Sequence, residues 1–167
     1  MTNNSQRLTF DHYYRYQELT ERLQVLARDN PGHMRLESLG QSFEGREIWC
    51  AVVTDFECGG DRDKPALWID GNIHASEVSA SSACLHLLHR LLSEKETKQI
   101  SYLLRTRTFY IVPRVNPDGA ELALADKPVY LRSSVRPYPY DEEPVKGLQV
   151  EDIDGDGRIL QMRLEQV

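Results

Sequence analysis

One short stretch constrains this chain more than any other, because it joins a strand to a helix through two side chains that can bind metal. An apolar run over 65–69 predicts a buried strand, and Gly71 and Asn72 break it. His74 and Glu77 follow, at the mouth of a predicted helix. Open α/β sheets hold ligands just past strand ends, and zinc takes imidazole nitrogen and carboxylate oxygen as ligands. The stretch indicates either half of a zinc site or a histidine and a glutamate paired on the surface.

The spacing of apolar residues predicts three helices. Over 11–29 the apolar residues recur at helical intervals, with Asp11 as the N-cap. A second helix is predicted over 76–95 and a shorter helical piece over 95–105. One face of the second helix carries Ser81, Cys84, Leu85, Leu88, Leu91 and Leu92.

Strands are predicted over 34–42, 46–54, 66–70 and 108–112. The first two flank a turn that contains Gly45, so we expect an antiparallel hairpin. The last two are separated by helix, which predicts a right-handed parallel crossover. The fold class is therefore α/β with a mixed sheet.

Two segments are predicted to be irregular. Residues 116–119 read Asn-Pro-Asp-Gly, which favours a tight turn that closes the last strand. Residues 126–150 are rich in proline and tyrosine, so we expect a long loop there.

The other histidines and most of the cysteines are interpreted as structural. His86 and His89 lie on the body of the second helix, two to three turns beyond the ligand pair, and cannot easily join it around one ion. His12 and His33 lie at the ends of the first helix and are expected to be solvated. Two cysteines are predicted to be core thiols, because free cysteine is usually buried: Cys50 and Cys84.

Charge and hydropathy limit the partners. The net charge of −6 and the absence of a basic stripe argue against nucleic acid and anionic membrane surfaces. No apolar run approaches the length of a membrane span, and the first residues lack the apolar core of a signal peptide. We therefore expect a cytoplasmic protein if Met1 is the native start.

Three motifs in order give the chain a family resemblance: 42–46 (SFEGR), 71–77 (GNIHASE) and 113–119 (PRVNPDG). Together they resemble the N-terminal part of a zinc carboxypeptidase of the carboxypeptidase A type. The resemblance implies a mixed sheet with helices on both faces, of which this chain holds the N-terminal portion. It places that portion at 8–135 and leaves 136–167 as an insertion or a continuation of the same domain.

The resemblance also implies a catalytic site. The family's zinc is held by two histidines and a glutamate, and His74 and Glu77 match the first two ligands. Arg132 is the candidate for the arginine that polarises the scissile carbonyl, and Arg136 is the second candidate; a solvated loop residue is the alternative. Ser76 stands where pancreatic members often have arginine, which leaves the contacts beyond the cleaved residue open.

The remaining site residues of the family lie further along its chains. They are the third zinc ligand, the Asn-Arg pair that grips the substrate carboxylate, a substrate-covering tyrosine and the general base. Nothing in 136–167 matches them. We therefore expect this chain to be part of a longer enzyme, which supplies the remainder of the domain, and to be inactive by itself.

An acidic loop near the end follows the start of a calcium-binding pattern. Asp152, Asp154 and Asp156 occupy positions 1, 3 and 5 of that pattern, but Arg163 stands where an EF-hand needs a bidentate glutamate. A looser calcium site and a plain acidic turn before a strand at 159–164 both remain open.

Three functions follow, in order of preference. The first is a zinc metallocarboxypeptidase that hydrolyses C-terminal peptide bonds. The second is a zinc deacylase of the desuccinylase kind, which would act on a small acyl-amino-acid with the same fold. The third is a non-enzymatic module that binds calcium through the acidic loop.

Overall fold

The computed structural model describes residues 8–136, 152 and 155–157. The chain divides into two units, Met1–Arg136 and Pro137–Val167. All the helices and strands of the described residues belong to the first unit.

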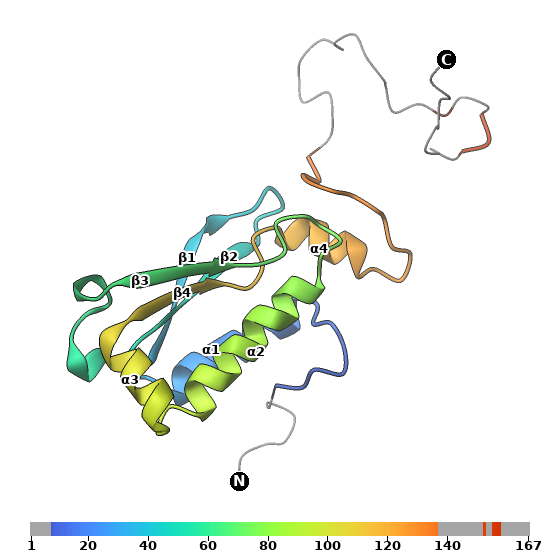
Figure 1. Ribbon diagram of the computed structural model, residues 1–167. Coiled ribbons are helices and arrows are strands. Elements are labelled where there is room, and N and C mark those ends of the chain that lie inside the picture. The colour runs from blue at the N-terminus through green and yellow to red at the C-terminus, as the bar shows by residue number, and fades with distance from the viewer. Residues whose placement is uncertain (1–7, 137–151, 153–154, 158–167) are drawn as a thin grey trace, which may run out of the picture. The chain divides into compact units, whose positions relative to one another are not determined.

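Four strands form one mixed sheet in the first unit (Figure 1): β1 (Met34–Gln41), β2 (Glu47–Val53), β3 (Ala66–Asp70) and β4 (Thr108–Val112). The strand order is β1-β2-β4-β3. β2 pairs antiparallel with both β1 and β4, whereas β3 pairs parallel with β4. The predicted hairpin and the predicted parallel pairing are both confirmed, and so is the mixed α/β fold class.

Four helices accompany the sheet: α1 (Tyr16–Asp29), α2 (Ser79–Ser93), α3 (Lys98–Thr106) and α4 (Pro117–Ala123). Two short 3-10 helices, η2 (Phe56–Cys58) and η3 (Asp61–Asp63), lie in the connection before β3. Figure 1 shows α1, α2 and α3 together on one side of the sheet, while α4 lies at the end where β4 finishes. No helix of the described residues is long and apolar enough to cross a membrane.

Two predicted helix starts are wrong. α1 begins at Tyr16 rather than after Asp11, because the Glu121 carboxylate accepts the Tyr16 N–H at 2.8 Å. The Asp11 side chain instead contacts the neighbouring His12 ring at 2.9 Å. α2 begins at Ser79, since the residues before it form turns.

The main core lies between the sheet and α1, α2 and α3. All six residues of the predicted α2 stripe are buried, and Leu88 is fully buried. Each fully buried leucine contributes roughly 2 kcal/mol of hydrophobic stabilisation. Both predicted core thiols are confirmed, since Cys50 and Cys84 are buried. His86 and His89 make edge contacts with the Phe10 ring, which agrees with a packing role for both.

The opposite face of the sheet carries a smaller cluster built around Cys50, Val52 and Val112. Among the described helices, only the short η2 packs against that cluster, through Phe56. The prediction that β3 is a buried strand is wrong, because Leu67 is 47% exposed and Trp68 is 58% exposed. The reason is its position at the edge of the four-stranded sheet, where Trp68 stacks on the Tyr110 ring at 6.5 Å. An edge strand with exposed apolar side chains is a surface prone to association.

Candidate metal site

The candidate site lies just past the ends of the parallel strands β3 and β4. The two segments that follow these strands stay hydrogen-bonded to each other. The Gly71 N–H donates to the Val112 carbonyl, and the Val115 N–H donates back to the Gly71 carbonyl, each at 3.0 Å. The Asn116 N–H then donates to the Asn72 carbonyl at 3.0 Å. The second and third sequence motifs therefore lie side by side at the carboxyl ends of these strands, which is where open α/β sheets bind ligands.

His74 and Glu77 face one another in the turn between β3 and α2. The His74 Nδ1 atom lies 3.0 Å from each carboxylate oxygen of Glu77. The two side chains are 35% and 56% exposed, so solvent reaches both. Two ligands bound at about 2.0–2.1 Å to a tetrahedral zinc are about 3.3 Å apart. The pair already has nearly the spacing and the donor types that one zinc ion requires.

The Asn-Pro-Asp-Gly segment is the start of α4, and the predicted tight turn is wrong. Asn116 is the N-cap, and its side-chain oxygen accepts the Gly119 N–H at 2.9 Å. Pro117 occupies the first turn, where its missing N–H is no loss. The turn between β3 and α2, which carries His74 and Glu77, is called the ligand turn below. α4 packs closely against it because residue 119 is glycine: a Cβ at that position would lie 2.5 Å from the Ala75 Cβ.

Asp118 joins the first motif to the third. Its buried carboxylate accepts hydrogen bonds from the Ser42 hydroxyl at 2.7 Å, the Glu44 N–H at 3.0 Å and the Arg46 guanidinium at 2.6 Å. Burial alone raises the pKa of Asp118, but these donors outweigh it and hold the pKa below its ordinary value. The hairpin turn is thus tied to the helix that packs beside His74.

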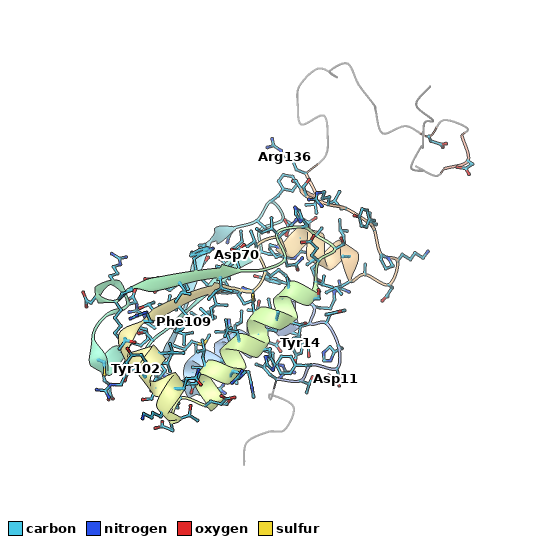
Figure 2. The ribbon with its side chains drawn as sticks, viewed as in Figure 1. Asp11, Tyr14, Asp70, Tyr102, Phe109 and Arg136 are labelled. Carbon is cyan, nitrogen blue, oxygen red and sulfur yellow. The ribbon has the colours of Figure 1, made fainter. Side chains whose placement is uncertain are left out.

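Arg132 lies next to the ligand turn. Its carbonyl accepts the Ala75 N–H at 3.0 Å, and the following carbonyl, of Ser133, accepts a hydrogen bond from the Asn116 side chain at 2.6 Å. These two bonds bring the loop after α4 to the turn that carries His74 and Glu77. Arg136 lies four residues further on (Figure 2), and its N–H donates to the Ser134 hydroxyl at 3.0 Å. The catalytic roles of both arginines stay predictions.

Three buried polar residues lie beside this turn, and the sequence assigned none of them a part in the site: Asn72, Ser81 and Arg114. Asn72 has a φ of 56°, the left-handed conformation that asparagine tolerates better than most residues. For Arg114, the available signal was its place between Pro113 and Val115, directly after an apolar strand, where a charged side chain is unusual.

The acidic loop belongs to the second unit. The Asp152 carboxylate accepts the N–H groups of Gly155 and Gly157, each at 2.8 Å. Asp154 and the predicted strand at 159–164 lie outside the described residues. Across the part of the chain that is described, no three or more His, Cys, Asp or Glu side chains gather as a metal site would need. The predicted calcium ligands, Asp156 included, therefore gain no support.

Comparison with known proteins places this geometry in context. The sequence profile of a family described as "Zinc carboxypeptidase" matches residues 19–138. Carboxypeptidase A2 of Rattus norvegicus is 35% identical over 111 residues, which cover 66% of this chain and 25% of the rat protein. A zinc carboxypeptidase of Saccharothrix mutabilis subsp. capreolus is 32% identical over 114 residues, which cover 68% of this chain and 26% of that protein.

A solved structure gives the same picture. Carboxypeptidase A from Helicoverpa armigera superposes with a TM-score of 0.66 at 27% identity, covering 79% of this chain and 31% of the insect chain. The similarity therefore extends from sequence to fold. The chain spans about a quarter of the length of the two relatives described above.

Proposed function

This chain belongs to the zinc carboxypeptidase family, and from that premise we propose that it supplies part of the active site of an enzyme that hydrolyses C-terminal peptide bonds. The observation that carries the proposal is the placement of His74 and Glu77, with Nδ1 3.0 Å from both carboxylate oxygens at the end of a parallel strand pair. Peptides are the proposed substrates.

In the proposed site, His74 and Glu77 hold zinc. The bound metal supplies a Lewis acid for the scissile carbonyl and lowers the pKa of a coordinated water toward neutrality. A catalytic zinc takes three protein ligands, and the described residues bring two together. Completing the site therefore requires a further ligand from outside those residues.

Arg132 is proposed to polarise the carbonyl of the substrate. Its backbone is fixed beside the ligand turn by the bond from the Ala75 N–H to its own carbonyl, while its side chain is exposed and available to a substrate. A guanidinium near the developing oxyanion stabilises the transition state by several kcal/mol, on the order of 10²–10³ in rate. We keep Arg136 as the second candidate for this role.

Zinc binding by the chain provides the first test. We expect Zn²⁺ to shift the NMR signals of the His74 ring in the unsubstituted chain. In calorimetric titrations, which need no signal from His74, we expect His74→Ala and Glu77→Gln each to weaken binding by ten-fold or more. His86→Ala is the matched control, because His86 is an exposed histidine on the body of α2 and is not part of the pair. Equal weakening by His86→Ala would contradict the assignment.

Substrate class is tested by hydrolysis with the protein that contains the complete site. An N-terminally blocked peptide and an N-succinyl amino acid are offered in parallel, with and without a zinc chelator. We expect chelator-sensitive release of the C-terminal residue from the peptide. Preference for the succinyl amino acid would instead establish the deacylase, which no comparison favours.

A further inference from the structure

The side chain of Asn72 is hydrogen-bonded to the backbone of the turn that carries His74. The Asn72 amide nitrogen donates to the carbonyl of His74 at 2.7 Å and to the carbonyl of Ala75 at 3.2 Å. Asn72 is only 2% exposed, so water does not compete for these two bonds. The backbone on either side of the proposed ligand is therefore fixed by one buried amide.

A second contact involves the oxygen of that amide. The Ser81 hydroxyl, in the first turn of α2, lies 3.2 Å from the Asn72 side-chain oxygen. Ser81 is also 2% exposed. An asparagine side chain can present either its oxygen or its NH₂ to a hydroxyl, which both donates and accepts. The Asn72–Ser81 contact alone would not decide which.

The two carbonyls of the turn decide it, because a carbonyl oxygen can only accept and therefore faces the Asn72 NH₂ group. The Asn72 oxygen is then directed toward Ser81, whose hydroxyl donates to it. The Arg114 Nε–H lies 3.2 Å from the Ser81 oxygen, and a guanidinium can only donate hydrogen bonds, so Ser81 accepts from Arg114 while its own proton goes to Asn72. The chain of hydrogen bonds has one direction, from the guanidinium to the backbone of His74.

The guanidinium is itself held in place, and its burial is unfavourable. Arg114 is 3% exposed, and its Nη2 donates to the Tyr14 carbonyl at 3.0 Å, in the segment before α1. Among the described residues, nothing accepts a hydrogen bond from its Nη1. A buried charge without a bonded carboxylate destabilises a fold, so a residue with an apolar side chain would suit a purely packing role better.

We propose that Arg114 and Ser81 are positioning residues for the metal site: through Asn72 they fix the turn that presents His74. The consequence for metal binding rests on the proposed function, because it takes His74 as a zinc ligand. Partners that orient the ligands of a metal typically change its affinity by 10–100-fold when they are removed.

The experiment uses the full chain and two measurements. Ser81→Ala removes the relay without adding volume, and Ser81→Thr keeps the hydroxyl. Leu88→Ala is the control for lost stability alone, since Leu88 is fully buried in the core on the same helix. The measurements are Zn²⁺ affinity, by titration of the His74 ring signals, and hydrogen exchange of the Ala75 N–H.

We expect Ser81→Ala to weaken Zn²⁺ binding at least ten-fold and to accelerate exchange at Ala75 at least ten-fold relative to Leu88→Ala. Ser81→Thr should stay within about three-fold of the unsubstituted chain in both measurements. Should Ser81→Thr fail to fold, Arg114→Lys replaces it as the conservative variant. A lysine keeps the charge and can donate to Ser81. The Ala75 N–H should therefore exchange more slowly in Arg114→Lys than in Arg114→Met.

The two proposals fail in different ways. If the unsubstituted chain shows no Zn²⁺-dependent shift at His74, the zinc assignment fails, and the exchange rates still decide whether Arg114 and Ser81 hold the turn. If Ser81→Ala and Leu88→Ala match in both measurements, the positioning role is overturned whatever the metal does.

Discussion

Replacing Asp118 by asparagine should destabilise the fold more than any surface substitution of the same kind. The carboxylate accepts three hydrogen bonds, from Ser42, Glu44 and Arg46, and is nearly inaccessible to solvent. An asparagine keeps the shape, but one of its two polar atoms becomes a donor. The donors that faced the lost oxygen are then left without an acceptor.

The magnitude follows from counting those donors. The Oδ1 atom of Asp118 accepts from Ser42 and Arg46, and Oδ2 accepts from Glu44. Whichever way the new amide is oriented, at least one donor loses its acceptor, and the charge partner of Arg46 disappears. A buried unsatisfied donor costs about 1–3 kcal/mol. The Arg46 side chain is 26% exposed and can be rehydrated, so the ion pair adds little. We expect a loss of about 3 kcal/mol, or a fall in Tm of roughly 6–12 °C for a chain of this size.

Urea denaturation at neutral pH measures the effect, and Glu44→Gln is the control. Glu44 also contacts Arg46, but its side chain is 42% exposed, so that substitution should change the free energy of unfolding by less than about 1 kcal/mol. A loss below 1 kcal/mol for Asp118→Asn, or equal losses for both variants, would refute the reasoning.

The same carboxylate predicts a dependence on pH. Because the folded pKa of Asp118 lies below its unfolded value, its contribution to stability is complete above an unfolded pKa of about 4 and is lost as the pH falls through the folded pKa. Below about pH 4, the stability of Asp118→Asn should therefore fall less steeply than that of the unsubstituted chain.

Two further predictions concern a close approach and the thiols. Gly119→Ala would place a Cβ 2.5 Å from that of Ala75, so we expect the free energy of unfolding to fall by about 2 kcal/mol in thermal or urea denaturation. Gly32→Ala is the control, because a Cβ there meets nothing within 4 Å and should leave stability unchanged. Equal effects of the two substitutions would show that the contact is not tight. Burial raises the pKa of Cys50 and of Cys84 to about 11, so a thiol reagent should modify only the exposed Cys58 in the folded chain and all three cysteines after unfolding; rapid modification of two or more thiols in the folded chain would contradict the burial.

Local patterns determined much of this fold because they report interactions between residues close in the chain. The apolar stripe of α2 is buried at all six predicted positions, since a helix brings every third or fourth residue to one face. The turn at Gly45 produced the β1–β2 hairpin, and the two apolar runs separated by helix produced the parallel pairing of β3 with β4. The pair His74 and Glu77 was visible for the same reason, because its members lie only three positions apart in the chain.

Distant contacts decided the rest. α1 starts late because a carboxylate 105 residues away takes the N–H of Tyr16. The Asn116–Gly119 segment became a helix whose Asp118 is anchored to a hairpin 76 residues earlier. β3 has the composition of a buried strand but occupies an edge, which only the strand order reveals.

The sequence by itself predicted the ligand pair, and it showed the order of the three motifs and the resemblance to zinc carboxypeptidases. Only the tertiary structure could show what holds that pair. Arg114 and Ser81 stand 40 and 7 residues beyond His74 in the chain, and no periodicity links either of them to it. Their relation to the ligand turn arises where the ends of two strands, the first turn of α2 and the segment before α1 are packed together. Such an arrangement follows from long-range packing, which local sequence patterns do not encode.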